Sequence, residues 1–304
     1  MVGPNLGLTA IVLGSAAGGG VPQWNCRCHV CELARAGDPR VPPRSQVSIA
    51  ISGDGESWLL IGASPDLRQQ ILATPALAPQ KGLRHSPIAG VVLINADVDG
   101  MAGLLAIRES QRFRLYTSAP LHQVLRANPV FDVLDPSLVQ RVTIEPSQPI
   151  ECGHGLSLCL LPMPGKVPLY LEDRAAVKPE PGPTYAALVE AGGRRALIAP
   201  ACADITDEVL AHMRQSDVVF FDGTLFTDDE MIRAGVGHKT GRRMGHVSIS
   251  GPEGSLARLA ELSIRRIFVH INNTNPVLIE GSDERRQVEA AGFEVAFDGM
   301  EVRL

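Results

Sequence analysis

Residues 91–109 read VVLINADVDGMAGLLAIRE and join a buried strand to a helix through a turn that carries two carboxylates. The apolar run VVLI predicts a strand, and MAGLLAIRE predicts the start of a helix. Asp97 and Asp99 lie two positions apart just past the strand end, where both carboxylates are well placed to bind a metal in a cleft. The alternative is a polar strand-to-helix turn in which Asp99 caps the helix. These residues alone leave both interpretations open.

Similar short apolar runs, bounded by Gly, Pro, Asp or Asn, recur along the chain and predict strands. They cover residues 8–13, 47–51, 58–61, 90–94, 113–117, 156–161, 185–189, 196–198, 217–221, 267–271 and 293–297. Helical patterns lie between some of them, at a helix start capped by Ser64 and at 206–214, 255–262 and 284–290. Strands alternate first with few helices and then with more. This order favours an α/β protein with two sheets flanked by helices, an αβ/βα sandwich, over one doubly wound sheet.

Composition excludes several classes of protein. The 304 residues are 45% hydrophobic, which excludes intrinsic disorder. The net charge is −5, and only 4% of residues are aromatic, so a basic or base-stacking nucleic-acid binder is not expected. No apolar stretch is long enough for a membrane span, and the N-terminus lacks a signal-peptide pattern, which predicts a cytoplasmic location. The Pro-rich stretch at 178–183 predicts a loop or lid rather than a linker.

Three of the six cysteines form a C-x-C-x-x-C run, Cys26, Cys28 and Cys31. Clustered cysteines in a chain without a signal peptide indicate metal ligands before disulfides. Three thiolates within one short loop suit structural zinc, which needs a fourth ligand to complete a tetrahedron. The fourth ligand could be His29, or a distant residue such as His270 or Asn273. The alternative is three reduced cysteines in a tight loop without metal.

Two further strands end in candidate ligands. Asp222 follows the strand at 217–221, and His270 lies at the end of the strand at 267–271. Either could be a structural residue. Three predicted strands each end in Asp or His, however, and this pattern favours a shared site. His246, in a glycine-rich loop, could be a metal ligand or a general acid or base. The acidic run Asp228-Asp229-Glu230 is expected to be the solvated first turn of a short helix.

The loop around His246 is also basic. Arg233, Lys239, Arg242 and Arg243 could clamp the carboxylates of a small anionic molecule. The alternative is a solvated loop with no ligand. An acidic chain can therefore still carry a local basic site.

Four motifs resemble the PQQ-biosynthesis protein B family. They are LGSAAGGGVPQWNCRCHVC, WLLIGASPDLRQQI, VGHKTGRRMGH and FVHINNTNPVL, and the resemblance runs from about residue 12 to residue 304. It implies a metallo-β-lactamase-like fold with residues 1–304 as one domain. It also implies structural zinc in a loop at about 24–32, held by Cys26, Cys28 and Cys31.

The resemblance further implies a role in making pyrroloquinoline quinone (PQQ) from a Glu–Tyr cross-linked peptide. One description of the family is a non-haem iron hydroxylase that acts on the tyrosine-derived ring. The other is a carrier that assists transport of PQQ or its precursor. Either role implies a small anionic precursor as partner and no nucleic acid. The oligomeric state stays open, with a homodimer as one alternative.

Laid on individual residues, the superfamily motif H-x-H-x-D-H falls on 95–100. Asn95 and Asp97 stand in its first two His positions, a loss that is usual in this family and that removes one of the two hydrolase metal sites. Asp99 matches the motif's Asp, and the family reads Asp-His where this chain reads Asp99-Gly100. The missing His would be a metal ligand, so Gly100 implies weaker metal binding or lost activity.

The resemblance also implies which other residues form the active site. Asp222 matches the bridging Asp of the superfamily, and His270 matches its last metal His. The expected active-site metal is Fe(II), bound by Asp99, Asp222 and His270. His246, in the family's M-G-H, is expected to act with Asp99 in catalysis. Lys239, Arg242 and Arg243 are expected to bind the substrate.

Overall fold

The computed structural model describes residues 7–171 and 184–304, and its strands form two seven-stranded sheets. The Pro-rich stretch at 178–183 lies outside the described residues. The first sheet has the order β14-β1-β2-β3-β4-β5-β6. Its strands are β1 (Thr9–Gly14), β2 (Ser48–Ser52), β3 (Trp58–Ile61), β4 (Ile88–Val92), β5 (Phe113–Thr117), β6 (Val139–Thr143) and β14 (Glu301–Arg303). Neighbours from β14 to β3 are antiparallel, and those from β3 to β6 are parallel.

The second sheet mirrors this arrangement with the order β13-β12-β11-β10-β9-β8-β7. Neighbours from β7 to β10 are antiparallel, and those from β10 to β13 are parallel. Its strands are β7 (Ile150–Gly153), β8 (Leu156–Pro162), β9 (Tyr185–Ala191), β10 (Arg194–Ala199), β11 (Val218–Asp222), β12 (Arg265–Val269) and β13 (Phe293–Val295). Each sheet therefore has a parallel half whose strands end at a common edge.

Helices are short throughout the described residues. They are α1 (His29–Arg35), α2 (Leu67–Ala73), α3 (Val98–Met101), α4 (Ala119–Arg126), α5 (Asp207–Arg214), α6 (Glu230–Arg233), α7 (Ser255–Arg258) and α8 (Asp283–Ala290). The 3₁₀ turns are η1 (Pro75–Leu77), η2 (Ala102–Ile107), η3 (Pro129–Val133), η4 (Leu169–Leu171), η6 (Arg242–Met244) and η7 (Pro276–Leu278). No helix among the described residues is both long and apolar enough to cross a membrane.

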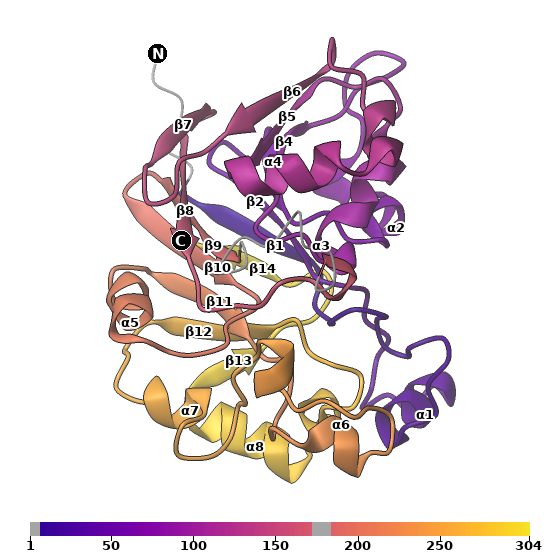
Figure 1. The fold of residues 1–304 in the computed structure, drawn as a ribbon, viewed down its shortest axis with the longest axis vertical. Coiled ribbons are helices and arrows are strands. Elements are labelled where there is room, and N and C mark those ends of the chain that lie inside the picture. The colour runs from indigo at the N-terminus through magenta and orange to yellow at the C-terminus, as the bar shows by residue number, and fades with distance from the viewer. Residues whose placement is uncertain (1–6, 172–183) are drawn as a thin grey trace.

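The two sheets pack face to face, and the helices cover their outer faces. Figure 1 shows α2 and α4 beside the first sheet and α5, α7 and α8 beside the second, with α1 at one side near α6. Two adjacent residues of β11 show how the layers are held together, because successive strand residues face opposite sides. Phe220 is buried between the sheets, and Phe221 is buried against the helices. Burial of each ring contributes roughly 2–3 kcal/mol. The predicted sandwich is confirmed.

Local predictions fail where a polar side chain has a different partner. Ser64 does not cap α2, because the helix begins later and the Ser64 hydroxyl donates to Gln70 Oε1 at 2.9 Å. Asp99 does not cap a helix either: α3 begins at Val98, and Asp97 is the residue before it. The strands β6, β7 and β14 were missed by the search for apolar runs because they are half-exposed and carry polar residues.

Candidate metal centre

Four candidate residues meet where the parallel strands of the two sheets end. Asp99 lies in α3, shortly after β4 of the first sheet, and Asp222 is the last residue of β11 in the second. His270 directly follows β12, and His246 follows the turn η6. Carboxyl ends of parallel strands share one edge, so residues far apart in sequence are brought together there. The three strand ends therefore converge, as the sequence predicts.

Direct hydrogen bonds join these residues in two pairs. His246 Nδ1 lies 2.8 Å from Asp222 Oδ2, and His270 Nε2 lies 3.1 Å from Asp99 Oδ2 across 171 residues of sequence. The two imidazole rings stack with centroids 5.1 Å apart. One ligand atom each from Asp222, His246 and His270 lies within 4.8 Å of the others. His246 thus takes the place of Asp99 in this candidate ligand set, which the sequence predicted as Asp99, Asp222 and His270.

Thr224 connects the two pairs and was missed by sequence reasoning. Its hydroxyl donates to Asp222 Oδ1 at 2.6 Å and lies 2.8 Å from His270 Nδ1 and 3.1 Å from His246 Nδ1. Such partners fix the orientation of imidazole and carboxylate ligands. Its place two residues after Asp222 in the sequence was the only available signal.

Burial and charge set the ionisation of the site. Burial favours the neutral form of Asp99, but the hydrogen bond and charge of His270 outweigh it and hold the pKa of Asp99 below its usual value. Burial likewise opposes the charge on His270, yet the hydrogen bond to Asp99 and its charge raise the pKa of that imidazole. Burial, followed by the charge of Asp99, raises the pKa of Asp97. Asp99 and His270 thus each stabilise the charged form of the other.

His270 itself adopts a left-handed backbone conformation with φ of 57°. Non-glycine residues rarely adopt this conformation, and they do so mostly where the surrounding structure requires it. The chain beyond His270 is fixed by Ile271 N donating to Ser15 O at 3.0 Å and by Asn272 N donating to Thr224 O at 3.0 Å. The turn carries the chain from the metal centre to the cysteine loop within three residues.

A cavity of about 160 Å³ opens beside the centre. Its wall includes Asp97, Asp99, His246 and His270, together with apolar residues of both sheets. Among the described residues that line it, Lys166 is the one Lys or Arg side chain. The expected substrate anchors Lys239, Arg242 and Arg243 are not part of this wall, and both arginines are exposed. Their role stays a prediction, and Lys166 is a residue that sequence reasoning missed.

Gly100 borders the same cavity, and Asn95 occupies the space next to it. A Cβ at position 100 would lie 2.6 Å from Asn95 Oδ1, closer than such atoms approach. That oxygen accepts a hydrogen bond from Asp97 N at 3.2 Å. A histidine at position 100 therefore needs Asn95 to turn away.

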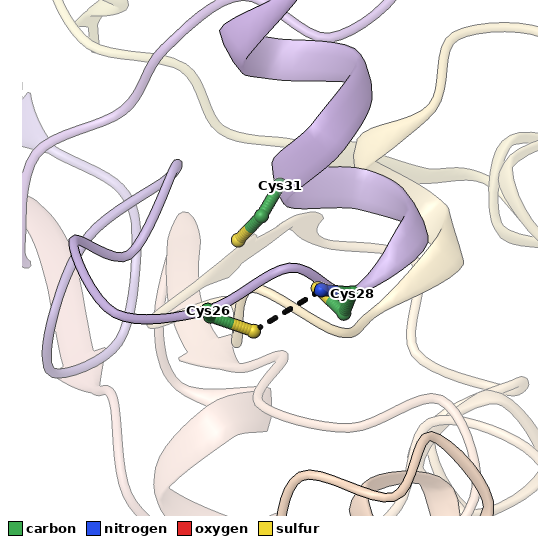
Figure 2. Close-up of side chains that lie close together, drawn as sticks. All are labelled: Cys26, Cys28 and Cys31. Carbon is green, nitrogen blue, oxygen red and sulfur yellow. Dashed lines mark hydrogen bonds between the residues drawn. The ribbon is translucent and has the colours of Figure 1, made fainter.

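The second cluster is the cysteine loop at the start of α1. Figure 2 shows Cys26, Cys28 and Cys31 turned toward one another, with Cys28 N donating to Cys26 Sγ at 3.4 Å. All three are free thiols in the structure. Burial raises the pKa of Cys28 to about 12. For Cys26, hydrogen bonds from Cys28, Cys31 and Asn273 outweigh burial and lower the pKa. Cys26 and Cys28 thus differ in how readily they ionise.

Asn273 faces all three sulfur atoms, with Nδ2 at 3.1, 3.5 and 3.3 Å from Cys26, Cys28 and Cys31. The amide N and O are interchangeable by rotation, so the same side chain can present Oδ1 to a cation. His29 is exposed, and His270 is engaged with Asp99. Of the three candidates for the fourth zinc ligand, Asn273 is the one at the thiols, and the donor set of three thiolates and one oxygen fits zinc.

Comparison with known proteins identifies the relatives of this chain. A beta-lactamase superfamily domain matches residues 57–271. The coenzyme PQQ synthesis protein B of Methylobacterium nodulans is 56% identical over 299 residues, which cover 98% of this chain and 100% of that protein. This chain belongs to the coenzyme PQQ synthesis protein B family. Its counterpart from Rhizobium meliloti is 53% identical and covers 98% of both chains.

Solved structures agree with this assignment. The crystal structure of zinc-bound PqqB from Methylobacterium extorquens matches with a TM-score of 0.94 at 54% identity, covering 97% of this chain and 100% of that one. A diphosphatase of the PhnP family matches with a TM-score of 0.70 at 22% identity, covering 98% and 97% of the two chains. The first match confirms the resemblance seen in the sequence and the metallo-β-lactamase fold. The second shows a shared fold alone.

Proposed function

We propose that this chain takes part in PQQ synthesis as an Fe(II)- and O₂-dependent hydroxylase of a tyrosine-derived Glu–Tyr precursor. The observation that carries the proposal is the set Asp222, His246 and His270, whose ligand atoms lie within 4.8 Å of one another. Two imidazoles and one carboxylate are the donors typical of non-haem Fe(II) oxygenases. When bound, Fe(II) would supply the redox chemistry with O₂. Membership of the coenzyme PQQ synthesis protein B family supports the pathway.

The residues around this set have roles that follow from their contacts. Thr224 Oγ1 lies at Nδ1 of both imidazoles and can orient them while Nε2 of each binds a metal. Asp99 lies at His270 Nε2, so a metal on that nitrogen would replace this hydrogen bond and have the Asp99 carboxylate beside it. Hydroxylation places one oxygen of O₂ in an aromatic C–H bond and releases the other as water, so it consumes two electrons and two protons from solution and an external reductant. Asp97, whose pKa burial raises, lines the cavity and can hold a proton there.

The test is turnover under controlled exposure to oxygen. The zinc-containing protein is loaded with Fe(II) without oxygen, mixed with the Glu–Tyr substrate and then exposed to isotopically labelled O₂. Mass spectrometry should find one labelled oxygen in the product. The Asp222→Asn variant, which keeps the size of the side chain, should give none. Product that carries no label, or equal labelling in the variant, would refute the proposal.

A second candidate is a carrier that shelters PQQ or its precursor without chemistry. Gly100 favours it, because the family's histidine at this position would be a metal ligand. Tight binding of PQQ with no labelled product would support the carrier. A zinc-dependent hydrolase is a weaker candidate, because Asn95 and Asp97 stand where the superfamily motif has His and a two-metal site needs both positions filled.

A further inference from the structure

The cavity beside the candidate metal centre is lined by both apolar and charged side chains. Its apolar residues include Ile49 of β2 and Ile61 of β3 in the first sheet and Ile198 of β10 in the second. Its polar residues include Asp97, His246 and His270. Such a lining favours an apolar group that carries a polar substituent.

The size of the cavity limits what can enter it. A cavity of roughly 150 Å³ lined by apolar side chains holds one benzene molecule. The cavity here is about 160 Å³ and therefore has room for one six-membered ring. A larger ligand must leave its other parts outside.

Lys166 is placed to recognise the substituent. Its stem packs over Gly245, where a Cβ would lie 3.0 Å from Lys166 Cγ, and Gly245 directly precedes His246. Gly245 has φ of 84°, a backbone conformation that favours glycine. Because glycine has no side chain, the lysine stem can lie against the backbone at this position. Lys166 is half-buried and makes no salt bridge or hydrogen bond with the described residues. Its charge acts on Asp97 without a direct ion pair among the described residues, and as the one Lys or Arg at the cavity wall it can pair with an anionic ligand.

We infer that Lys166 pairs with the carboxylate of the ligand whose ring enters this cavity and thereby selects which ligands bind there. The inference rests on the proposed function for the identity of the ring. The apolar walls take the ring, its edge faces His246 and His270, and Lys166 fixes its direction. Lys166 is a specificity-determining residue in this arrangement, in place of Lys239, Arg242 and Arg243.

Two probes that differ only in charge test this inference. They are p-hydroxyphenylpropionate and its neutral carboxamide, titrated calorimetrically into full-length protein of fixed metal content. The wild type should bind the carboxylate about tenfold more tightly than the amide, because a charge-assisted contact contributes that much. Lys166→Met keeps the stem on Gly245 and should remove the preference, and Lys166→Arg should retain most of it. Lys81→Met, at an exposed and remote lysine, should leave the preference intact.

Three outcomes would overturn the inference. They are an unchanged preference in Lys166→Met, loss of the preference in Lys239→Met instead, and no binding of either probe to the wild type at millimolar concentration. The titration requires no turnover, so it separates this inference from the proposed function. Labelled product with no role for Lys166 overturns only the inference. A Lys166-dependent preference without labelled product overturns only the hydroxylase.

Discussion

Replacement of Glu230 by glutamine should change how the stability of this protein depends on pH. Glu230 begins α6 and is only 7% exposed. Its carboxylate accepts hydrogen bonds from Phe226 N at 2.7 Å and from the Thr274 hydroxyl at 2.5 Å. Thr274 follows Asn273 in the loop after β12, so Glu230 holds the segment that lies between the two candidate metal sites.

Burial raises the pKa of Glu230 to about 7 from the usual 4.5, against the opposing hydrogen bond of Thr274. The folded protein thus binds this proton more tightly than the unfolded chain does. The corresponding stability is complete below about pH 4.5 and is lost as the pH rises through about 7. At 1.36 kcal/mol per pKa unit, the loss amounts to about 3 kcal/mol.

The assay is urea-induced unfolding of protein reconstituted with zinc, at about pH 5 and about pH 8. Metal ligands titrate in both proteins, so the difference between wild type and Glu230→Gln isolates the one carboxyl group. The free energy of unfolding of the wild type should fall by about 2–3 kcal/mol more than that of the variant. Glu145→Gln, at an exposed glutamate, should behave as the wild type. Equal pH dependence in wild type and Glu230→Gln would refute the reasoning.

Three further changes test the rest of the molecule. Gly100→His alone should bind Fe(II) no better than the wild type, because Asn95 fills the space. The double variant Asn95→Ala with Gly100→His should raise the affinity by about tenfold in a metal titration. Equal affinities of the single and double variants would show that Asn95 is no obstacle. Thr224→Val should weaken Fe(II) binding by about tenfold with little change in melting temperature, and an unchanged affinity would remove Thr224 from the site. Asp298→Ala should cost about 3 kcal/mol in urea unfolding, because Asp298 accepts four hydrogen bonds from Ser15 and Ser45; a loss below about 1 kcal/mol would contradict that role.

The sequence predicted most strands, because their apolar residues follow a regular pattern, and it predicted the candidate ligands that lie at strand ends. Alternating and apolar runs gave most strands of both sheets, and the candidate ligands Asp222 and His270 were found because each ends a buried run. The cysteine loop was found because its three thiols are close in sequence. Such local patterns have physical causes that act within a few residues.

The failures come from partners that are distant in sequence. Glu230 was expected on a solvated turn, yet it is buried because Thr274, 44 residues later, packs against it. Lys166 lacks any local pattern, and its position beside the centre depends on the close approach of Gly245. The sequence did not decide between Asp99 as a helix cap and Asp99 as part of the centre. The partner that decides it is His270, which follows a strand of the other sheet and bonds to the Asp99 carboxylate.

We propose that the chain holds two separate metal sites, the cysteine cluster and the centre of Asp222, His246 and His270. Elemental analysis of reconstituted protein tests this directly, for the wild type, Asp222→Asn and Cys28→Ser. The wild type should hold one zinc ion at the thiols and one Fe(II) at the centre. Asp222→Asn should lose the iron and keep the zinc, and Cys28→Ser should lose zinc first. Full iron content in Asp222→Asn would show that the centre is not the iron site.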